Sequence, residues 1–387
     1  MKQFSTGQEL KETSLAAFPL DSKINLQQTI FEPAGTATKG TKEFLVSRKT
    51  MDAKKVRGPE SPLYTAVCPL VYVARVFGLA PYEFHNDILI PSSINSIYAF
   101  VCLIAYTYII YSVMLGFTGK AREKPLLGLT EVACNFLMAI FDIIMTLFMR
   151  DKFVRIWNGI QDYDEIVKNL GYARSESRTC VWAWIMLVTN FLTWISVHKF
   201  GMFAFEETWI NNVSYMIVYV GSSISIIKFS GMALLLGQRF HHLNVVAKKC
   251  STLTSRWLLT TPIVDSKDIE YLHNILMMTS ENLNSLYSWS LLFWLGNLSM
   301  HIVDDLYFVI QRMIAVSWTI SEWRMLSCLL SWIAAFLEQL ILLNFACHFA
   351  ASEASSNHSF IFIDEHAPSS LFGTPDAERS VTFRSLR

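Results

Sequence analysis

The feature that most constrains this chain is a series of apolar runs, each about eighteen residues long or longer. At about 1.5 Å per residue, a helix of that length crosses the hydrocarbon core of a bilayer, which is about 30 Å thick. The runs are continuous rather than alternating, which favours helices over a membrane β-barrel. Composition agrees, since 52% of the 387 residues are hydrophobic and only 17% are charged. The sequence therefore predicts an all-α, polytopic membrane helical bundle with six spans, near residues 94–117, 126–149, 179–198, 210–237, 286–307 and 325–347.

The composition changes at both ends of the chain. Residues 1–62 are polar and basic and contain no hydrophobic region typical of a signal peptide, which is the pattern of a disordered cytosolic tail. Residues 358–387 hold no apolar run of spanning length and mix Ser, Pro and charged residues. We expect a membrane domain at 63–357 between two disordered tails.

One apolar segment, residues 66–84, precedes the first span. It is interrupted by Pro69, Arg75 and Pro81, which makes it too short to cross a membrane on its own. We interpret it as an interfacial or re-entrant helix, and the alternative is a seventh span.

The positions of Lys and Arg predict the orientation of the bundle. Cytosolic loops of membrane proteins are enriched in these residues. With the N-terminus inside, most of the 32 Lys and Arg residues are cytosolic, and the internal loops 150–178 and 238–285 alone carry more of them than all the outer loops. The sequon at Asn212 then lies at the outer end of the fourth span, as a glycosylation candidate. We predict a cytosolic N-terminus.

Three ionisable residues lie within the predicted spans. Counted at 1.5 Å per residue, Asp142 is about 24 Å and Lys228 about 27 Å below the outer boundary. Similar depth predicts that the two side chains pair, with Glu338 at about 20 Å as the competing partner. Such a pair either fixes the register of the helices or serves as a gating contact.

A second set of polar and aromatic residues lies toward the predicted outer side. Aromatic residues at the ends of spans are normally interfacial anchors. Aromatic faces with nearby carboxylates and amides also suit a pocket for a small polar molecule, such as a sugar. The candidate ligand-binding residues are Glu131, Asn135, Trp194, His198, Tyr215, Tyr219, His301, Asp304, Asp305, Tyr307 and Trp323.

The motifs of the common enzyme classes do not occur in the sequence. It contains no GxSxG, HExxH, Walker or GxGxxG pattern, and the pair His241-His242 has no Cys or carboxylate cluster beside it in the sequence. A net charge of zero and the lack of a basic stripe argue against a nucleic-acid partner. We expect neither enzymatic activity nor a cofactor or metal.

Four segments, in this order, resemble the insect gustatory receptor family. They are "PLVYVARVFGLAPYEF" before the first span, "LLLGQRFHHLN" at the end of the fourth, the stretch from "LHNILMMTSENLNSLYSW" to "IVDDLYF", and "ACHFAASEASSN" after the sixth. Each motif is degenerate, and the resemblance rests on their order and topology over about residues 66–357.

The resemblance implies an N-inside chemoreceptor that forms a homo- or hetero-tetrameric, ligand-gated cation channel in the plasma membrane of chemosensory neurons. Its ligand would be a tastant, a sugar or a bitter compound, bound in the outer half of each subunit. The fifth and sixth helices would continue below the membrane into an anchor domain, and a seventh helix with a Thr-Tyr…Gln-Phe signature would line the pore. This sequence departs from the family pattern after Ser356, where no such helix follows. We therefore expect a product that lacks the pore helix.

Two other classes remain open. A polytopic transporter or an accessory membrane protein would also be rich in apolar spans, although the two halves of this sequence show no internal repeat. A seven-span G-protein-coupled receptor would require residues 66–84 to cross the membrane and the N-terminus to lie outside.

Overall fold

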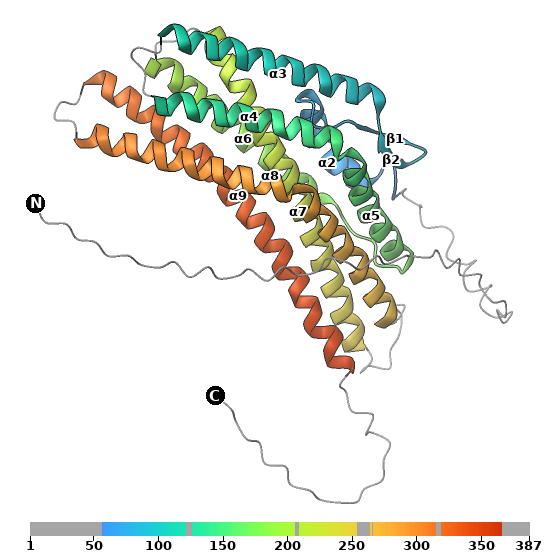
Figure 1. The fold of residues 1–387 in the computed structure, drawn as a ribbon. Coiled ribbons are helices and arrows are strands. Elements are labelled where there is room, and N and C mark those ends of the chain that lie inside the picture. The colour runs from blue at the N-terminus through green and yellow to red at the C-terminus, as the bar shows by residue number, and fades with distance from the viewer. Residues whose placement is uncertain are drawn as a thin grey trace, which may run out of the picture. The chain divides into compact units, whose positions relative to one another are not determined.

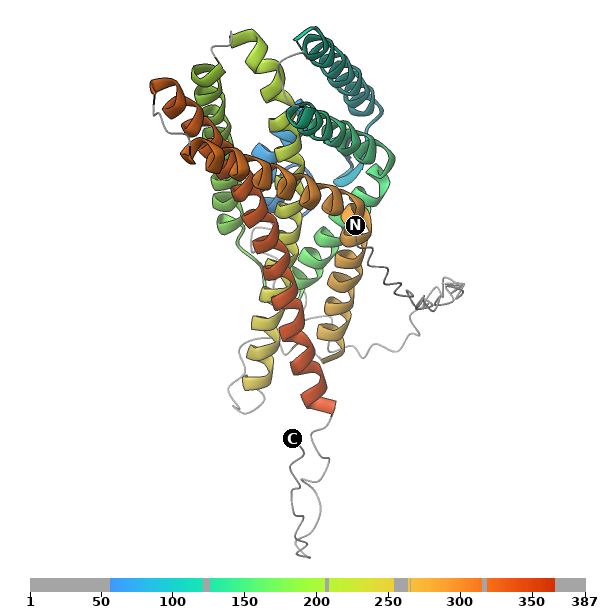
Figure 2. The same ribbon diagram turned by 60° about the vertical axis from the view of Figure 1, so that its left-hand side comes forward.

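The computed structural model describes residues 56–120, 126–205, 209–253, 264, 266–314 and 319–365, and these form helices and one small sheet (Figures 1 and 2). The helices are α2 (Pro62–Val76), α3 (Ser93–Lys120), α4 (Leu126–Phe148), α5 (Arg150–Asn169), α6 (Ser177–Phe205), α7 (Trp209–Leu253), α8 (Ser266–Ile314) and α9 (Ile320–Glu365). The strands are β1 (Tyr82–His85) and β2 (Ile88–Pro91).

Each of the six predicted apolar runs corresponds to one helix, α3, α4, α6, α7, α8 or α9. The last three are much longer than a span, with 45, 49 and 46 residues. In Figure 1 the C-terminal ends of α6 and α8 meet the starts of α7 and α9 at the upper left, here named the α8–α9 end. The C-terminal ends of α7 and α9 lie at the bottom of the same view.

The count of membrane-spanning helices differs from the prediction. Among the described residues, four helical segments are long and apolar enough to cross a membrane: Ser93–Val113, Ser177–Phe205, Met216–Cys250 and Ile320–Ser356. The pair Ala133–Phe148 and Arg150–Asn169, bent by 68°, is a fifth if it forms one broken span. The protein is therefore a polytopic helical membrane protein, in which α8 does not meet the same criterion.

Helix α5 was not foreseen, because residues 150–169 carry many charges and were assigned to a cytosolic loop. Its buried residues recur at helical spacing, as in Phe153, Ile156, Trp157 and Ile160, and form one apolar face. That periodicity is the signal by which the sequence could have predicted the helix.

The segment 66–84 is only partly helical. Helix α2 begins after Ser61, whose Oγ accepts a hydrogen bond from the Tyr64 amide at 3.1 Å, and it ends at Val76. The chain then enters a β-hairpin with Asn86 and Asp87 at its turn, at φ of 47° and 70°. Asn and Asp tolerate this left-handed conformation, which two-residue hairpin turns require. The hairpin is an addition to the all-α class that the sequence did not predict.

Helix α7 lies at the centre of the core. In the apolar stretch of α7 that could cross a membrane, 94% of the residues are buried, whereas in that of α3 only 11% are buried. It packs against α2, α4, α6, α8 and α9. Small residues, among them Ser222, Ser223, Ser225 and Ser230, are buried along it and allow its neighbours to approach closely.

The predicted tails fall mostly outside the described residues. Residues 1–55 and 366–387 are not described, whereas residues 358–365 form the last part of α9 rather than belonging to a tail.

Candidate ligand-binding site

Five side chains from four helices form an aromatic cluster: Trp194 of α6, Tyr219 of α7, His301 of α8, and Trp332 and Phe336 of α9. The ring centroids of Tyr219 and Trp332 are 4.7 Å apart, and those of Tyr219 and Trp194 are 5.5 Å apart. The His301 ring stacks on Phe336 at 4.5 Å. Counted at 1.5 Å per residue, the five lie about 15–24 Å from the α8–α9 end. The structure therefore brings together three of the residues singled out from the sequence.

Polar atoms border this cluster. The Nε1 of Trp194 donates to Ser223 Oγ at 3.1 Å, and that hydroxyl donates to Asn190 Oδ1 at 2.6 Å. The Nε2 of His301 and the Nδ2 of Asn190 are buried and have no hydrogen-bond partner in the protein. Because an unsatisfied buried polar group is costly, these two atoms are suited to bind a polar ligand or water.

The other candidate residues lie apart from the cluster. Asn135, on α4, accepts a hydrogen bond from Asn297 Nδ2 at 3.3 Å. Tyr307 and Trp323 are 54% and 57% exposed, as interfacial anchors would be. His198, Asp304 and Asp305 are half-buried. The side chains of Glu131 and Tyr215 are outside the described part of the chain.

Asn212, the glycosylation candidate, is 7% exposed. Its Nδ2, the atom that a glycan would modify, donates to the backbone oxygen of His198 at 3.2 Å. In this structure that amide joins α7 to α6 instead of facing solvent.

Two cavities lie deeper in the bundle, on either side of Lys228. The first, named here the α2–α7 pocket, lies between α2, α5, α6 and α7 and spans about 690 Å³ including the space open at its mouth, and apolar side chains such as Leu70, Met186 and Met232 line most of it. The second spans about 420 Å³ on the same measure, and Asp142 lines it together with Lys228. Lys228, Tyr82 and Phe153 line both cavities.

Two of the three ionisable residues within the predicted spans, Lys228 and Asp142, lie in this region, and all three bond to groups other than one another. The Nζ of Lys228 donates to the Leu79 backbone oxygen at 2.7 Å, and Asp142 Oδ2 accepts from Trp294 Nε1 at 3.1 Å. Glu338 accepts from the Thr193 hydroxyl at 2.5 Å, which links α9 to α6. Asp142 attracts Lys228 at longer range, and the structure shows no ion pair within 4.0 Å between these described residues.

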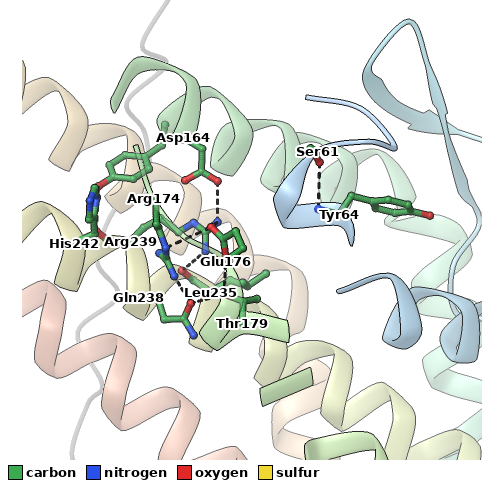
Figure 3. A network of polar contacts seen from close by, with 11 residues as sticks. Ser61, Tyr64, Asp164, Arg174, Glu176, Thr179, Leu235, Gln238, Arg239 and His242 are labelled. Atoms are coloured by element: carbon green, nitrogen blue, oxygen red, sulfur yellow. Dashed lines mark hydrogen bonds and ion pairs between the residues drawn. The ribbon is translucent and has the colours of Figure 1, made fainter. Parts of the chain in front are cut away.

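Figure 3 shows a polar network centred on Arg239 of α7, a residue that the sequence analysis did not single out. Its Nη2 donates to Asp164 Oδ2 at 2.7 Å and to Glu176 Oε1 at 2.9 Å, and its side chain has no exposed surface. Arg174 lies beside it and donates to Gln238. The network ties α5 and the segment before α6 to α7.

The charges in this network shift the pKa of their neighbours. Although burial disfavours the charged form of Glu176, the guanidinium groups of Arg239 and Arg174 lower the pKa of that carboxyl below its usual value. Burial, together with the charge of Arg239, lowers the pKa of Arg174 to about 10. Both groups remain ionised at neutral pH and hold each other in place.

Sequence reasoning also missed Trp332 and Phe336, which complete the cluster, and Asn190, which borders it. All three lie inside long apolar runs, where a ligand contact and a packing residue have the same pattern. In the part of the chain that the structure describes, no group of three His, Cys, Asp or Glu side chains is placed to hold a metal ion.

Residues 67–358 match the family model described as 7tm chemosensory receptor. No curated protein matches the chain.

Proposed function

Because this chain belongs to the 7tm chemosensory receptor family, we propose that it is a gustatory-type receptor subunit. It works in the plasma membrane of chemosensory neurons as part of a tetrameric, tastant-gated, non-selective cation channel. The family is a class of receptors and not of enzymes. Membership of the family implies that the protein binds a small molecule. The proposal adds that this molecule is a tastant, that the subunits form a tetramer and that the tetramer is a channel.

The aromatic cluster is the tastant site in this proposal. The observation that carries it is the buried, unpartnered Nε2 of His301 next to stacked aromatic rings from three other helices. A sugar stacks its apolar face on such rings while its hydroxyls bond to nitrogen and oxygen atoms beside them. A ligand held between α6, α7, α8 and α9 would contact four helices at once, so it could bias how they pack.

The orientation belongs to the same proposal. The distribution of Lys and Arg supports a cytosolic N-terminus. With the six spans of the proposed topology, α5 and the lower parts of α7, α8 and α9 are on the cytosolic side. The α8–α9 end, and with it the aromatic cluster, then faces outward.

A matched pair of variants on α8 tests the site. His301→Phe keeps a ring to stack on Phe336 but removes the unpartnered nitrogen, whereas Tyr307→Phe removes a hydroxyl that is exposed on the same helix. The assay is Ca²⁺ influx in cells that express the chain with a panel of sugars and bitter compounds, with ligand-induced thermal stabilisation of the purified protein alongside it.

We expect His301→Phe to raise the half-maximal concentration of the active compound at least tenfold, a change of about 1.4 kcal/mol in binding, and Tyr307→Phe to leave it unchanged. Equal responses in the two variants would remove the cluster as the site. A purified protein that no compound stabilises and that gives no influx would count against the proposed function itself.

The expectation that the pore helix is missing concerns the chain beyond Glu365, outside the described residues. Sequencing the messenger beyond codon 357 tests it.

A further inference from the structure

The α2–α7 pocket has the lining of a small-molecule site, which is mostly apolar with a few polar groups. The space between its lining atoms, together with the open space at its mouth, is about 690 Å³. Apolar side chains from α2, α5, α6 and α7 line nearly all of it. Its polar side chains include Thr179 and Gln238 in addition to Lys228. The surface of the pocket is therefore mostly apolar, and one cationic side chain lies in its wall.

Among the residues that the structure describes, no carboxylate lies within 4.0 Å of the Lys228 ammonium. Lys228 is 6% exposed, one hydrogen bond of its ammonium goes to the Leu79 carbonyl, and the group lies 4.5 Å from the centroid of the Phe153 ring. Contact with an aromatic face offsets part of the cost of removing an ammonium from water. An anion at hydrogen-bond distance from the ammonium would offset the rest and keep the group charged.

Asp142 does not fill that role at contact distance. Its carboxylate lines the second cavity and is held by Trp294 Nε1. Lys228 thus stands between Asp142 and the α2–α7 pocket, whose surface next to the ammonium is aromatic and aliphatic. An anion that enters this pocket meets the cation before it meets the carboxylate.

The pocket reaches the outer surface of the helices. Trp182 of α6 lines it and is 45% exposed, and its neighbours Val181 and Ile185 are exposed apolar side chains on the same helix. Since α6 is one of the candidate spans, this rim lies on a surface of α6 that a bilayer would cover. An amphiphile dissolved in the membrane can therefore enter from the side.

We propose that the α2–α7 pocket binds a long-chain carboxylate, with its carboxylate on the ammonium of Lys228 and its hydrocarbon chain between α2, α6 and α7. The site is separate from the aromatic cluster, since none of the five cluster residues lines either cavity. The proposal does not depend on which tastant opens the receptor, or on whether one does.

The test is native mass spectrometry of the purified full chain, titrated with oleate in detergent. Oleyl alcohol is the probe that keeps the chain and lacks the charge. Lys228→Met removes the cation at nearly the same length. Gly231→Leu fills the pocket, because a Cβ at Gly231 lies 3.4 Å from Leu70 Cδ2, in ordinary contact.

Gly296→Leu is the matched control on α8, where a Cβ meets nothing within 4 Å. We expect saturable binding of oleate, weakened at least tenfold by Lys228→Met and by Gly231→Leu and unchanged by Gly296→Leu. Oleyl alcohol should bind at least tenfold more weakly than oleate and be insensitive to Lys228→Met. If Lys228→Met does not fold, Gly231→Leu against Gly296→Leu and oleate against oleyl alcohol still decide the matter.

Oleate binding that is equal in wild type and Gly231→Leu means partition into the micelle, and it overturns the proposal. Equal affinities for oleate and oleyl alcohol overturn the role of Lys228. A fatty acid that copurifies with the protein before any is added identifies the membrane as the source, whereas binding only after addition identifies an external compound.

Discussion

Single buried charges in this protein join elements that are far apart in the sequence. Arg239 bonds to Asp164, 75 residues before it, and to Glu176, 63 residues before it. A buried charge is tolerated only where such partners meet it, and removal of one partner leaves the others uncompensated. The Arg239 network is therefore a place where one substitution has a large effect.

Arg239→Met should destabilise the protein by about 3–5 kcal/mol, because it leaves two carboxylates in a buried site without their cation. Arg57→Met is the matched control. Arg57 also contacts two carboxylates, those of Asp162 and Glu165, but the three side chains are 29–47% exposed and such pairs contribute about 0–1 kcal/mol. Thermal unfolding in detergent measures both variants, and similar losses in the two would contradict the importance of burial here.

Acid should weaken the same network. Because the folded-state pKa of Glu176 is lowered, the unfolded chain takes up a proton near the usual value of about 4.3 while the folded protein does not. Its contribution is fully present above that pH and is lost as the pH falls through the folded-state pKa. We expect Glu176→Gln to flatten the fall in unfolding temperature between about pH 5 and 3.

The control for this measurement is Glu165→Gln, at a side chain that is 44% exposed. Its unfolding temperature should follow the same slope with pH as the wild type. If Glu176→Gln also follows that slope, Glu176 is not a source of the acid sensitivity.

For single residues, the sequence predicted a shared region of the bundle but not the atoms that each side chain contacts. Counting residues along the helices predicts similar depths for Asp142 and Lys228, and both side chains line one cavity. Their hydrogen-bond partners, Trp294 and the Leu79 carbonyl, depend on how each helix is turned and on a loop after α2. A sequence without repeats or paired motifs carries no signal for either.

At the scale of the elements, α7 lies close against α9 at Gly237. A Cβ at this position would lie 2.6 Å from Phe349 Cδ1 and 3.1 Å from Ala350 Cα, which belongs to the backbone of α9. The absence of a side chain on Gly237 therefore allows α7 and α9 to lie this close together.

Gly237→Ala should lower stability by about 1–3 kcal/mol, since α9 must shift to admit the methyl group. Gly296→Ala is expected to raise stability by up to about 1 kcal/mol, because alanine favours a helix more than glycine and a Cβ there meets nothing within 4 Å. Thermal unfolding of the two variants in parallel gives the comparison. If Gly237→Ala leaves the unfolding temperature unchanged, α9 can shift to admit the methyl group at little cost, and the contact does not constrain the two helices.

Element prediction succeeded where hydrophobicity was continuous and failed where it was periodic or local. Six apolar runs became six helices, although their ends were misplaced, because polar lower halves such as residues 238–253 of α7 look like loops by composition. Helix α5 was missed because its charges mask one buried face. The hairpin turn consists of two residues, Asn86 and Asp87, and the sequence pattern around them is too short to predict a hairpin.

For the whole molecule, the proposed topology makes a direct prediction. Tags at the N- and C-termini should both be accessible only after cells are permeabilised, since six spans return the chain to the side on which it began. Antibody labelling of intact and permeabilised cells measures this. Termini on opposite sides would instead favour a seventh span, and an accessible N-terminus would reverse the orientation.

The burial of α7 has a consequence for how this protein is made. In the finished bundle, 94% of the residues in its apolar stretch, which includes Lys228, are buried. Helices α8 and α9 are among the elements that pack against it. Both of these helices follow it along the chain, so the ribosome delivers α7 first. During that interval a helix with a charged residue and several serines, costly to leave in lipid, waits without the partners that will cover it. During biosynthesis, α7 therefore depends on the insertion machinery to keep its polar side chains out of lipid until α8 and α9 have been made.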